Sequence, residues 1–380
     1  MEGAVFGLVV VTGLGPRSPR TEVRRSLDPL VESDGMMLDK RSPGLTSPAP
    51  RAPRGPVLVT GANGFVGRAL IRRLLADGRT VRAAVRRSLP PGASLPCPVS
   101  IVGEIGPETA WADALGGVDA VVHLAAAVHR FHAAAGEADR EYRRVNVDGT
   151  RALAEACAQS GVRRFVLVST VKVHGESTHG HPVTEADPPA PEDPYGISKW
   201  EAEQALKQIA QDAGMESVVL RPPLIYGPGV RANFHALVEA VRRGVPLPLG
   251  AVQNRRSIVF VENFVDAVDR CLDCEQAAGE TFLVDDGAPV STSALIRALA
   301  ESMGRSARLL PVPPAWLRTL GRLTGRSATV DRLLSDLEVD SSKLRRLCGW
   351  TPPFDLSAGL RETVAETSYA ATASRATKSS

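Results

Sequence analysis

The sequence has 380 residues, of which 43% are hydrophobic and 23% charged, close to the average of globular proteins. These values exclude a chain that is disordered throughout, a collagen and a coiled coil. The formal net charge is only +3, so the chain lacks the broad basic field that binding to a nucleic-acid backbone requires. We therefore expect no nucleic-acid partner.

The five cysteines are scattered along the chain. An odd, scattered set argues against a disulfide framework and for a reducing, cytoplasmic location. Cys271 and Cys274 form a CxxC pair, but no second pair stands at zinc spacing, so we expect no metal site. The apolar run at residues 4–11 is too short to cross a bilayer and has no basic flank. We therefore predict no membrane partner.

Residues 12–56 are rich in Pro, Arg and Ser without a sustained period, and we predict a disordered extension over 1–54. From Gly55 onward, short β-branched runs alternate with longer amphipathic ones. Strands are expected at 57–60, 81–85, 99–102, 120–124, 165–169 and 217–220. Helices are expected at 65–76, 139–159 and 195–212. This alternation predicts an α/β fold with a doubly wound parallel sheet.

The alternation loosens after Gly229. There we expect helices at 233–242, 263–275, 292–303, 327–337 and 356–364, and strands at 257–261 and 281–284. We interpret 55–226 with about 252–284 as the sheet domain, and 227–251 with 285–366 as a smaller mixed lobe. Residues 367–380 are predicted to be a polar tail.

The run VLVTGANGFVGRAL joins the first strand to the first helix. It places Gly61, Gly64 and Gly67 at three-residue spacing. Glycines there permit a tight turn and close approach of a pyrophosphate, while the helix N-terminus supplies N–H donors for the anion. The segment predicts a dinucleotide site in a Rossmann-type domain, although its spacing differs from the GxGxxG of long-chain dehydrogenases.

Tyr195 and Lys199 stand four residues apart at the head of a predicted helix that Asp193 and Pro194 open. The two side chains therefore lie on one helical face. A phenol, with a pKa near 10, is a poor base at neutral pH unless a neighbouring cation lowers that value. Thr170 ends a strand at the carboxyl edge of the sheet, where ligands bind. The three residues predict acid/base chemistry on a substrate oxygen.

Seven segments together resemble the extended short-chain dehydrogenase/reductase family, in its nucleotide-sugar epimerase, dehydratase and reductase branch. They follow the family's order over about residues 56–365 and read VTGANGFVG, HLAAAV, VNVDGT, STVKVHG, DPYGISK, LRPPLIYGPG and LCGWTPPFDLSAGL. The late segments are most similar to a UDP-glucose 4-epimerase-like subgroup. The resemblance implies that the sheet domain binds NAD(P) and that the smaller lobe binds substrate.

The resemblance also implies roles for individual residues. Thr170, Tyr195 and Lys199 would be catalytic, with Asn146 supporting Lys199 through water. Tyr195 and Lys199 would also contact the cofactor, with Lys199 reaching the nicotinamide ribose. The remaining cofactor contacts would be Gly61, Asn63, Gly64, Phe65, Val66, Gly67, Leu124, Ala125, Ala126 and Pro223. The substrate diphosphate would be held by Arg256 and, as a weaker candidate, Arg332.

Two departures from the family pattern stand out. NAD-preferring epimerases carry an acidic residue at the end of the second strand, but here Val85 is followed by Arg86 and Arg87. An arginine suits the 2′-phosphate of NADP, so NADP is predicted over NAD. His174 stands where the family usually has Tyr, and we interpret it as a packing residue.

The predicted reaction is oxidoreduction at C4 of a UDP-hexose derivative, by a 4-epimerase or a 4-keto-sugar reductase for surface-polysaccharide precursors. A dehydratase is disfavoured because Val171 and Lys172 stand where acidic residues are expected. Two alternatives remain: a 3β-hydroxysteroid or dihydroflavonol type of reductase acting on an apolar alcohol or ketone, and a non-catalytic NADP-binding sensor. The resemblance also implies a homodimer formed through the two long helices. The sequence leaves the sugar and its stereochemistry open.

Overall fold

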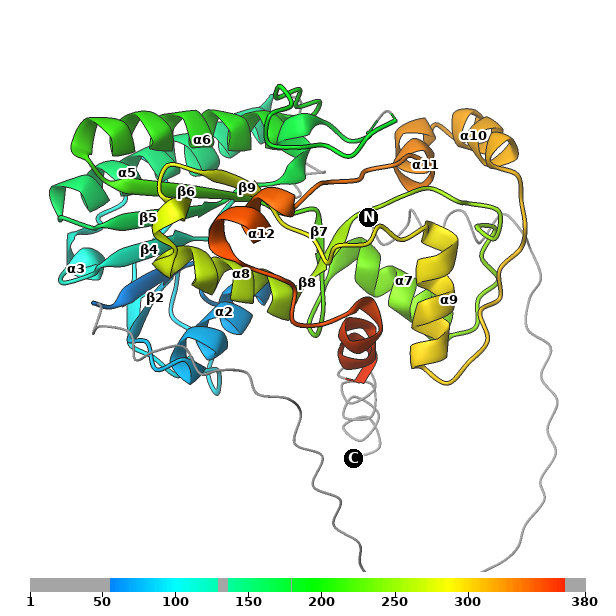
Figure 1. Ribbon diagram of the computed structural model, residues 1–380, viewed down its shortest axis with the longest axis horizontal. Coiled ribbons are helices and arrows are strands. Elements are labelled where there is room, and N and C mark those ends of the chain that lie inside the picture. Colours follow the sequence, from blue (N-terminus) through cyan, green and yellow to red (C-terminus); the bar gives the residue numbers. More distant parts are fainter. Residues whose placement is uncertain (1–54, 129–135, 179, 366–380) are drawn as a thin grey trace, which may run out of the picture.

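Seven parallel strands form the centre of the computed structural model, in the order β3-β2-β1-β4-β5-β6-β9 (Figure 1). The structure describes residues 55–128, 136–178 and 180–365, so the predicted extension at 1–54 and tail at 367–380 lie outside it. The strands are β1 (Val57–Thr60), β2 (Val81–Val85), β3 (Val99–Ile101), β4 (Ala120–His123), β5 (Arg164–Val168), β6 (Glu216–Arg221) and β9 (Thr281–Leu283). Each agrees with its predicted range to within a residue or two.

Helices cover both faces of the sheet, which confirms the doubly wound prediction. On one face α2 (Phe65–Ala76) packs against α8 (Val261–Asp273), and on the other α5 (Gly149–Gln159) packs against α6 (Pro194–Ala213) (Figure 1). Side chains alternate along β1: Val57 and Val59 enter the core under α2 and α8, whereas Leu58 enters the core under α5 and α6. Strands buried on both faces need apolar residues at every position, which explains the continuous runs in the sequence.

The helix predicted at 139–159 is interrupted by a wider turn. It comprises α4 (Glu137–Tyr142), a π-helical segment (Arg143–Asp148) and α5. Gly149 follows the π segment, and a Cβ atom there would lie 2.6 Å from Ile105 Cγ2. The helix therefore needs glycine at this point to pack against the loop before α3 (Ala112–Leu115). Single π turns are frequent at functional sites, and this one contains Asn146.

A second, two-stranded parallel sheet pairs β7 (Leu224–Tyr226) with β8 (Ile258–Phe260). Beside it α7 (Ala232–Arg242) packs against α9 (Thr292–Ser302), and α10 (Pro314–Leu323) forms a hairpin with α11 (Ser327–Leu334). Residues 356–365 are helical, as predicted. In the described ranges no helix is long and apolar enough to cross a bilayer. The division of the chain into a cofactor domain and a substrate lobe remains a prediction.

Three helices were missed and one was predicted too long. The sequence pattern predicted no helix at α3, at α10 or at α12 (Ser342–Cys348). Helix α10 begins at the second of two consecutive prolines, and proline is favoured at the first helical position, where Pro314 stands. The helix expected at 327–337 ends at Leu334, because Leu337 instead forms a parallel bridge with Arg256.

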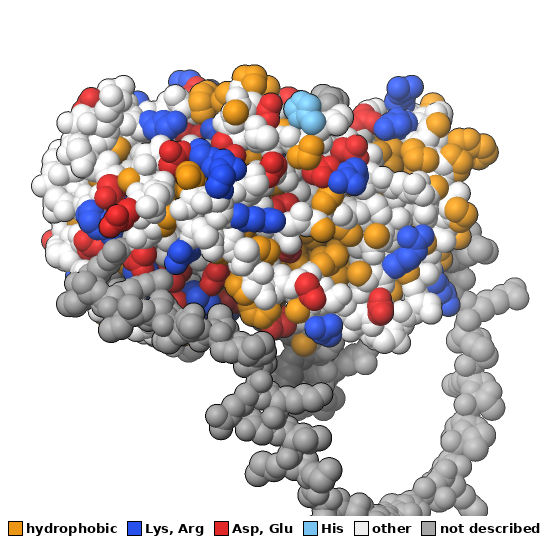
Figure 2. Space-filling model, viewed as in Figure 1, with side chains coloured by type: hydrophobic (Ala, Val, Ile, Leu, Met, Phe, Trp, Pro, Cys, Tyr) orange, Lys and Arg blue, Asp and Glu red, His pale blue; other side chains and the backbone are white. Residues whose placement is uncertain are grey.

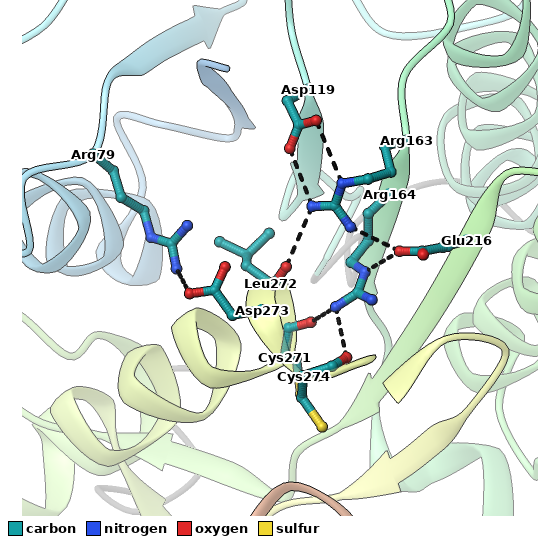
Figure 3. Close-up of polar contacts among 9 residues, drawn as sticks. All are labelled: Arg79, Asp119, Arg163, Arg164, Glu216, Cys271, Leu272, Asp273 and Cys274. Carbon is teal, nitrogen blue, oxygen red and sulfur yellow. Dashed lines mark hydrogen bonds and ion pairs between the residues drawn. The ribbon is translucent and has the colours of Figure 1, made fainter. Parts of the chain in front are cut away.

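An ion-pair network fixes the last turn of α8 to the amino edge of the sheet (Figure 3). Arg164 begins β5, and its side chain is 1% exposed. Its guanidinium donates to Glu216 at 2.6 Å and to the carbonyl oxygens of Cys271 and Cys274 at 2.5 and 2.8 Å. These carbonyls lack helical partners at a helix C-terminus. This network lies at the edge opposite the carboxyl ends of the strands and has a structural role.

The structure corrects the expectation about cysteines, because Cys274 forms a disulfide with Cys348. The bond joins the end of α8 to the end of α12 and bridges 74 residues. Cys271, the other member of the CxxC, is buried and free, as is Cys157. Cys271 and Cys274 stand close together in the sequence, but the disulfide partner of Cys274 lies on the distant helix α12.

We expect Cys348→Ser to lower the free energy of unfolding by about 2–4 kcal/mol, because a disulfide restricts the unfolded chain. Denaturant unfolding without reductant measures this difference. With reductant, the wild type and the variant should have the same free energy of unfolding. Cys97→Ser, at a free and partly exposed cysteine, serves as the control and should change little. Titration of five free thiols in the denatured, unreduced wild type would show that the bond does not form.

Candidate active site

The glycine turn brings three segments close together at the carboxyl edge of the sheet. Gly61 has a φ of +64°, and a Cβ atom on it would lie 2.9 Å from the Ala125 nitrogen after β4. A Cβ atom on Gly67 would collide with the Gly61 carbonyl oxygen and lie 2.9 Å from Ala62 Cα. Helix α2 begins directly after Gly64, which has no side chain to cap its first amides. An open helix N-terminus beside a glycine turn fits the pyrophosphate of a dinucleotide.

Thr60 and His123 hold the ends of β1 and β4 together, and neither residue was predicted from the sequence. The Thr60 hydroxyl accepts hydrogen bonds from the Leu124 and Ala125 amides, both at 3.2 Å, and lies 2.7 Å from His123 Nδ1. With both lone pairs occupied, the hydroxyl donates to Nδ1. Burial lowers the pKa of His123 to about 3, so its ring is neutral. This contact fixes Leu124 and Ala125, two of the predicted cofactor-binding residues.

Asn146 joins the segment after β4 to the head of α6. Its side-chain oxygen accepts from the Ala127 amide at 2.7 Å, and its amide donates to the Ala127 carbonyl at 3.2 Å and to Ser198 Oγ at 2.9 Å. Ser198 in turn donates to the Tyr195 carbonyl at 2.8 Å. Both amide hydrogens of Asn146 are therefore used, and the structure shows it positioning the Tyr195 turn. The water-mediated link to Lys199 remains a prediction.

Tyr195 and Lys199 lie one turn apart on α6, as predicted. The Asp193 carboxylate caps this helix by accepting from the Gly196 amide at 2.6 Å, and Pro194 is its first residue. Burial, with further contributions from Asp193 and Tyr142, raises the pKa of Tyr195 above its ordinary value. Burial lowers the pKa of Lys199 to about 8. Without a further positive charge nearby, Tyr195 therefore keeps its proton at neutral pH.

Thr170 follows β5 and lies close to the start of α6. Its hydroxyl accepts from the Lys172 amide at 3.3 Å and caps a short 3-10 turn (Val171–His174). The Lys172 ammonium donates to Asp193 at 2.5 Å and to Glu176 at 2.8 Å. The segments that carry Thr170 and Tyr195 are thus tied together through Lys172 and Asp193. The neighbouring Ser169 hydroxyl is buried with no hydrogen-bond partner in the described part of the chain.

A buried ion pair lies one turn beyond Lys199. Arg221 donates to both carboxylate oxygens of Glu203, at 3.1 and 2.5 Å, and the two side chains are 5% and 2% exposed. The third contact of Arg221 is with His174 Nε2 at 2.7 Å. Because arginine only donates, His174 accepts, and burial lowers its pKa to about 4. His174 is buried, as predicted for a packing residue, and it also binds Arg221.

Arg86 and Arg87 follow β2 and share one carboxylate. Arg86 lies 3.3 Å and Arg87 3.0 Å from Glu104, and all three side chains are exposed. A cofactor phosphate at this position would therefore compete with Glu104. Among the other predicted contacts, Asn63 is exposed, whereas Pro223 is buried just after β6.

Arg256 and Arg332, the predicted diphosphate ligands, are brought together by α11. Arg256 donates to the Arg332 carbonyl at 2.8 Å and to the Ser335 carbonyl at 3.1 Å. Burial lowers the pKa of Arg256. The Arg332 side chain pairs with Glu176, which also binds Lys172. This chain of contacts connects α11 to the segment that carries Thr170.

In the described ranges, no cluster of three or more His, Cys, Asp or Glu side chains could hold a metal ion. His129 and His132 lie outside these ranges, and His179 falls in the short gap after 178. His181 Nδ1 lies 3.2 Å from the carbonyl oxygen of the adjacent Pro182.

The sequence matches the model of the NAD dependent epimerase/dehydratase family over residues 57–284. It is 42% identical over 310 residues to a UDP-glucose 4-epimerase of Vibrio cholerae, covering 81% of this chain and 94% of that protein. A 3 beta-hydroxysteroid dehydrogenase/Delta 5-->4-isomerase of Mycobacterium tuberculosis is 31% identical over 335 residues, covering 81% and 89%. The solved structure of MoeE5 with UDP-glucuronic acid and NAD is similar with a TM-score of 0.65 and 29% identity, covering 83% of this chain and 100% of that one.

The family match covers the glycine turn and the segments that carry Thr170, Tyr195 and Lys199. The sheet order and the flanking helices agree with a Rossmann-like α/β fold. This chain therefore belongs to the NAD dependent epimerase/dehydratase family and is an NAD(P)-binding enzyme of the extended short-chain dehydrogenase/reductase type.

Proposed function

We propose that the enzyme catalyses oxidoreduction at C4 of a UDP-hexose derivative, as a 4-epimerase acting on precursors of surface polysaccharides. The observation that carries the proposal is the arrangement of Thr170, Tyr195 and Lys199 at the carboxyl edge of the sheet, tied together by Asn146, Ser198 and the Lys172–Asp193 pair. The 42% identical UDP-glucose 4-epimerase supports the sugar class.

The environment of Tyr195 suits a group that exchanges a proton with the substrate. In epimerisation the phenolate of Tyr195 would first accept the proton of the C4 hydroxyl while the hydride moves to the oxidised nicotinamide, and the phenol would return a proton when the ketone is reduced. Burial raises the pKa of Tyr195, so the positive charges of Lys199 and of the oxidised nicotinamide would have to lower it for the first step. Lys199, with a pKa near 8, is mostly protonated at neutral pH and favours the phenolate. Thr170 positions the same oxygen by hydrogen bonding. A nicotinamide held by the glycine turn would supply the hydride acceptor and donor for the sugar carbon.

The proposed site for the nucleotide diphosphate is the Arg256–Arg332 pair. The two side chains come from segments that meet at the end of α11, and two guanidinium groups match the charge of a diphosphate. A bound diphosphate would have to draw Arg332 away from Glu176. We further propose a homodimer formed through α5 and the helix that carries Tyr195.

The test of this function is an assay with purified enzyme. UDP-glucose, UDP-GlcNAc and a UDP-4-keto-6-deoxy sugar are incubated with and without added NADPH. An epimerase forms the C4 epimer without net loss of cofactor, whereas a reductase consumes NADPH in proportion to product. A 3β-hydroxysteroid is included because of the steroid-dehydrogenase relative. Turnover of the steroid with none of the sugars would overturn the proposal.

We also propose that NADP is preferred over NAD, because Arg86 and Arg87 stand where an acidic residue would bind the ribose. Arg86→Asp should weaken NADPH binding about tenfold or more relative to NADH, since it removes a phosphate ligand and adds a repelling charge. The opposite variant, Glu104→Gln, frees both arginines and should strengthen NADPH binding. Fluorescence titration with NADPH and with NADH measures the affinities of both variants. An unchanged ratio of NADPH affinity to NADH affinity in Arg86→Asp would disprove the preference.

A further inference from the structure

Helix α10 carries a stripe of exposed apolar side chains. Trp316 is 73% exposed and Leu323 81% exposed, the two highest values among the large hydrophobic residues of the described chain. Leu320, which is half-buried, lies between them. The spacing of four and then three residues places all three on one face of the helix. Figure 2 shows hydrophobic side chains gathered where α10 and α11 lie in Figure 1.

This stripe is separate from the contacts that hold the hairpin together. Leu317 and Gly321 are the buried residues of α10, and a Cβ atom on Gly321 would lie 2.8 Å from Val330 Cγ2 of α11. The two helices therefore pack closely through another face. Burial of Trp316 and Leu323 is not needed for this packing, so their exposure calls for an explanation outside the hairpin.

The hairpin is also strongly cationic. Between 314 and 334 the sequence has four arginines, Arg318, Arg322, Arg326 and Arg332, and Asp331 is the only acidic residue. Arg318 pairs with Asp331 at 3.5 Å, and Arg332 pairs with Glu176. Arg322 and Arg326 form no ion pair with the described residues and are exposed. Their charge is available to an external anionic partner.

We propose that α10 docks on the surface of a lipid bilayer that contains anionic headgroups. An amphipathic helix with Trp and Leu on one face and Arg beside it lies in the interface, with the apolar face among acyl chains and the cations at lipid phosphates. Charge complementarity favours this surface over an apolar protein patch. The prediction of no membrane partner rested on the lack of a spanning segment, and surface docking needs none.

Docking is tested with the full-length protein and sedimented vesicles of phosphatidylcholine, with and without phosphatidylglycerol. We expect the wild type to bind vesicles with phosphatidylglycerol and to be released by salt. Trp316→Glu combined with Leu323→Glu should reduce binding at least tenfold. The matched control is Ile101→Glu, at a residue that is 60% exposed on β3, and it should bind as the wild type does. Arg322→Gln combined with Arg326→Gln should lose the dependence on phosphatidylglycerol.

Three results would overturn the proposal. The first is a wild type that stays in the supernatant with both vesicle types, and the second is a double glutamate variant that binds vesicles as well as the wild type does. The third is a wild type that binds no vesicles and that light scattering shows to be an oligomer, with the double glutamate variant a monomer, since the stripe would then be an interface between copies. Turnover of soluble UDP-sugars, measured in parallel, should be unchanged in this variant. A failure of docking is thereby distinguished from a failure of the proposed reaction.

Discussion

Tyr195→Phe should lower kcat by about 10²- to 10⁴-fold while cofactor binding stays close to that of the wild type. The substitution removes one hydroxyl from a half-buried position and leaves the ring in place beside Tyr142, whose ring centroid is 6.1 Å away. General acid/base groups contribute rate factors of this size. The measurement is steady-state turnover of the UDP-sugar, together with a cofactor titration on the same preparation.

The matched control is Tyr142→Phe, which removes the neighbouring hydroxyl but leaves Tyr195 intact. It should retain turnover within about tenfold, because its contribution to the pKa of Tyr195 is smaller than that of burial. A Tyr195→Phe variant with unimpaired turnover would refute the catalytic assignment. A Tyr195→Phe variant that also loses cofactor binding would indicate that Tyr195 is needed to fold the site.

Glu203→Gln should lower the free energy of unfolding by about 3–5 kcal/mol, because it leaves Arg221 buried without its countercharge. Both side chains are almost inaccessible to solvent, and Glu203 lies on α6 together with Tyr195 and Lys199, two of the proposed catalytic residues. Loss of the Glu203 charge should also lower the pKa of Lys199 further, because Glu203 raises that pKa toward its ordinary value. Denaturant unfolding gives the stability change.

Two comparisons isolate the effect of burial. Glu201 lies on α6 like Glu203, and Glu201→Gln breaks its ion pair with Arg143 of the π-helical segment. There the side chains are 29% and 67% exposed, so the cost in unfolding free energy should stay below about 1 kcal/mol. Replacing both buried partners, as Glu203→Leu with Arg221→Met, should recover most of the stability because no lone charge remains. Equal costs for the buried and exposed single variants would contradict this explanation.

Local patterns predicted the part of the fold that depends on them. Continuous β-branched runs indicated strands buried on both faces, and the glycine turn, with its strand before and helix after, indicated the dinucleotide site. Asp193 and Pro194 correctly marked the start of α6. These signals work because each depends on residues close together in the sequence, or on a spacing that one helix fixes.

Contacts between distant segments gave no comparable signal. Thr60 meets His123 after 63 residues, and Arg221 meets His174 after 47. The disulfide partner of Cys274 could not be predicted for the same reason. Helix α10 was not predicted, yet its apolar stripe is apparent once the helix is recognised. The residue types in these contacts are ordinary, and only the tertiary fold brings them together.

Hydride transfer at C4 is tested most directly with an isotope. The enzyme is incubated with its preferred UDP-hexose carrying deuterium at C4, in ordinary water, and the epimer is analysed by mass spectrometry and NMR. If C4 is oxidised and reduced again by the same bound cofactor, the epimer retains deuterium at C4, because a hydride on nicotinamide does not exchange with water. Loss of the deuterium to solvent during epimerisation would show that C4 is deprotonated instead and would contradict the proposed role of Thr170, Tyr195 and Lys199.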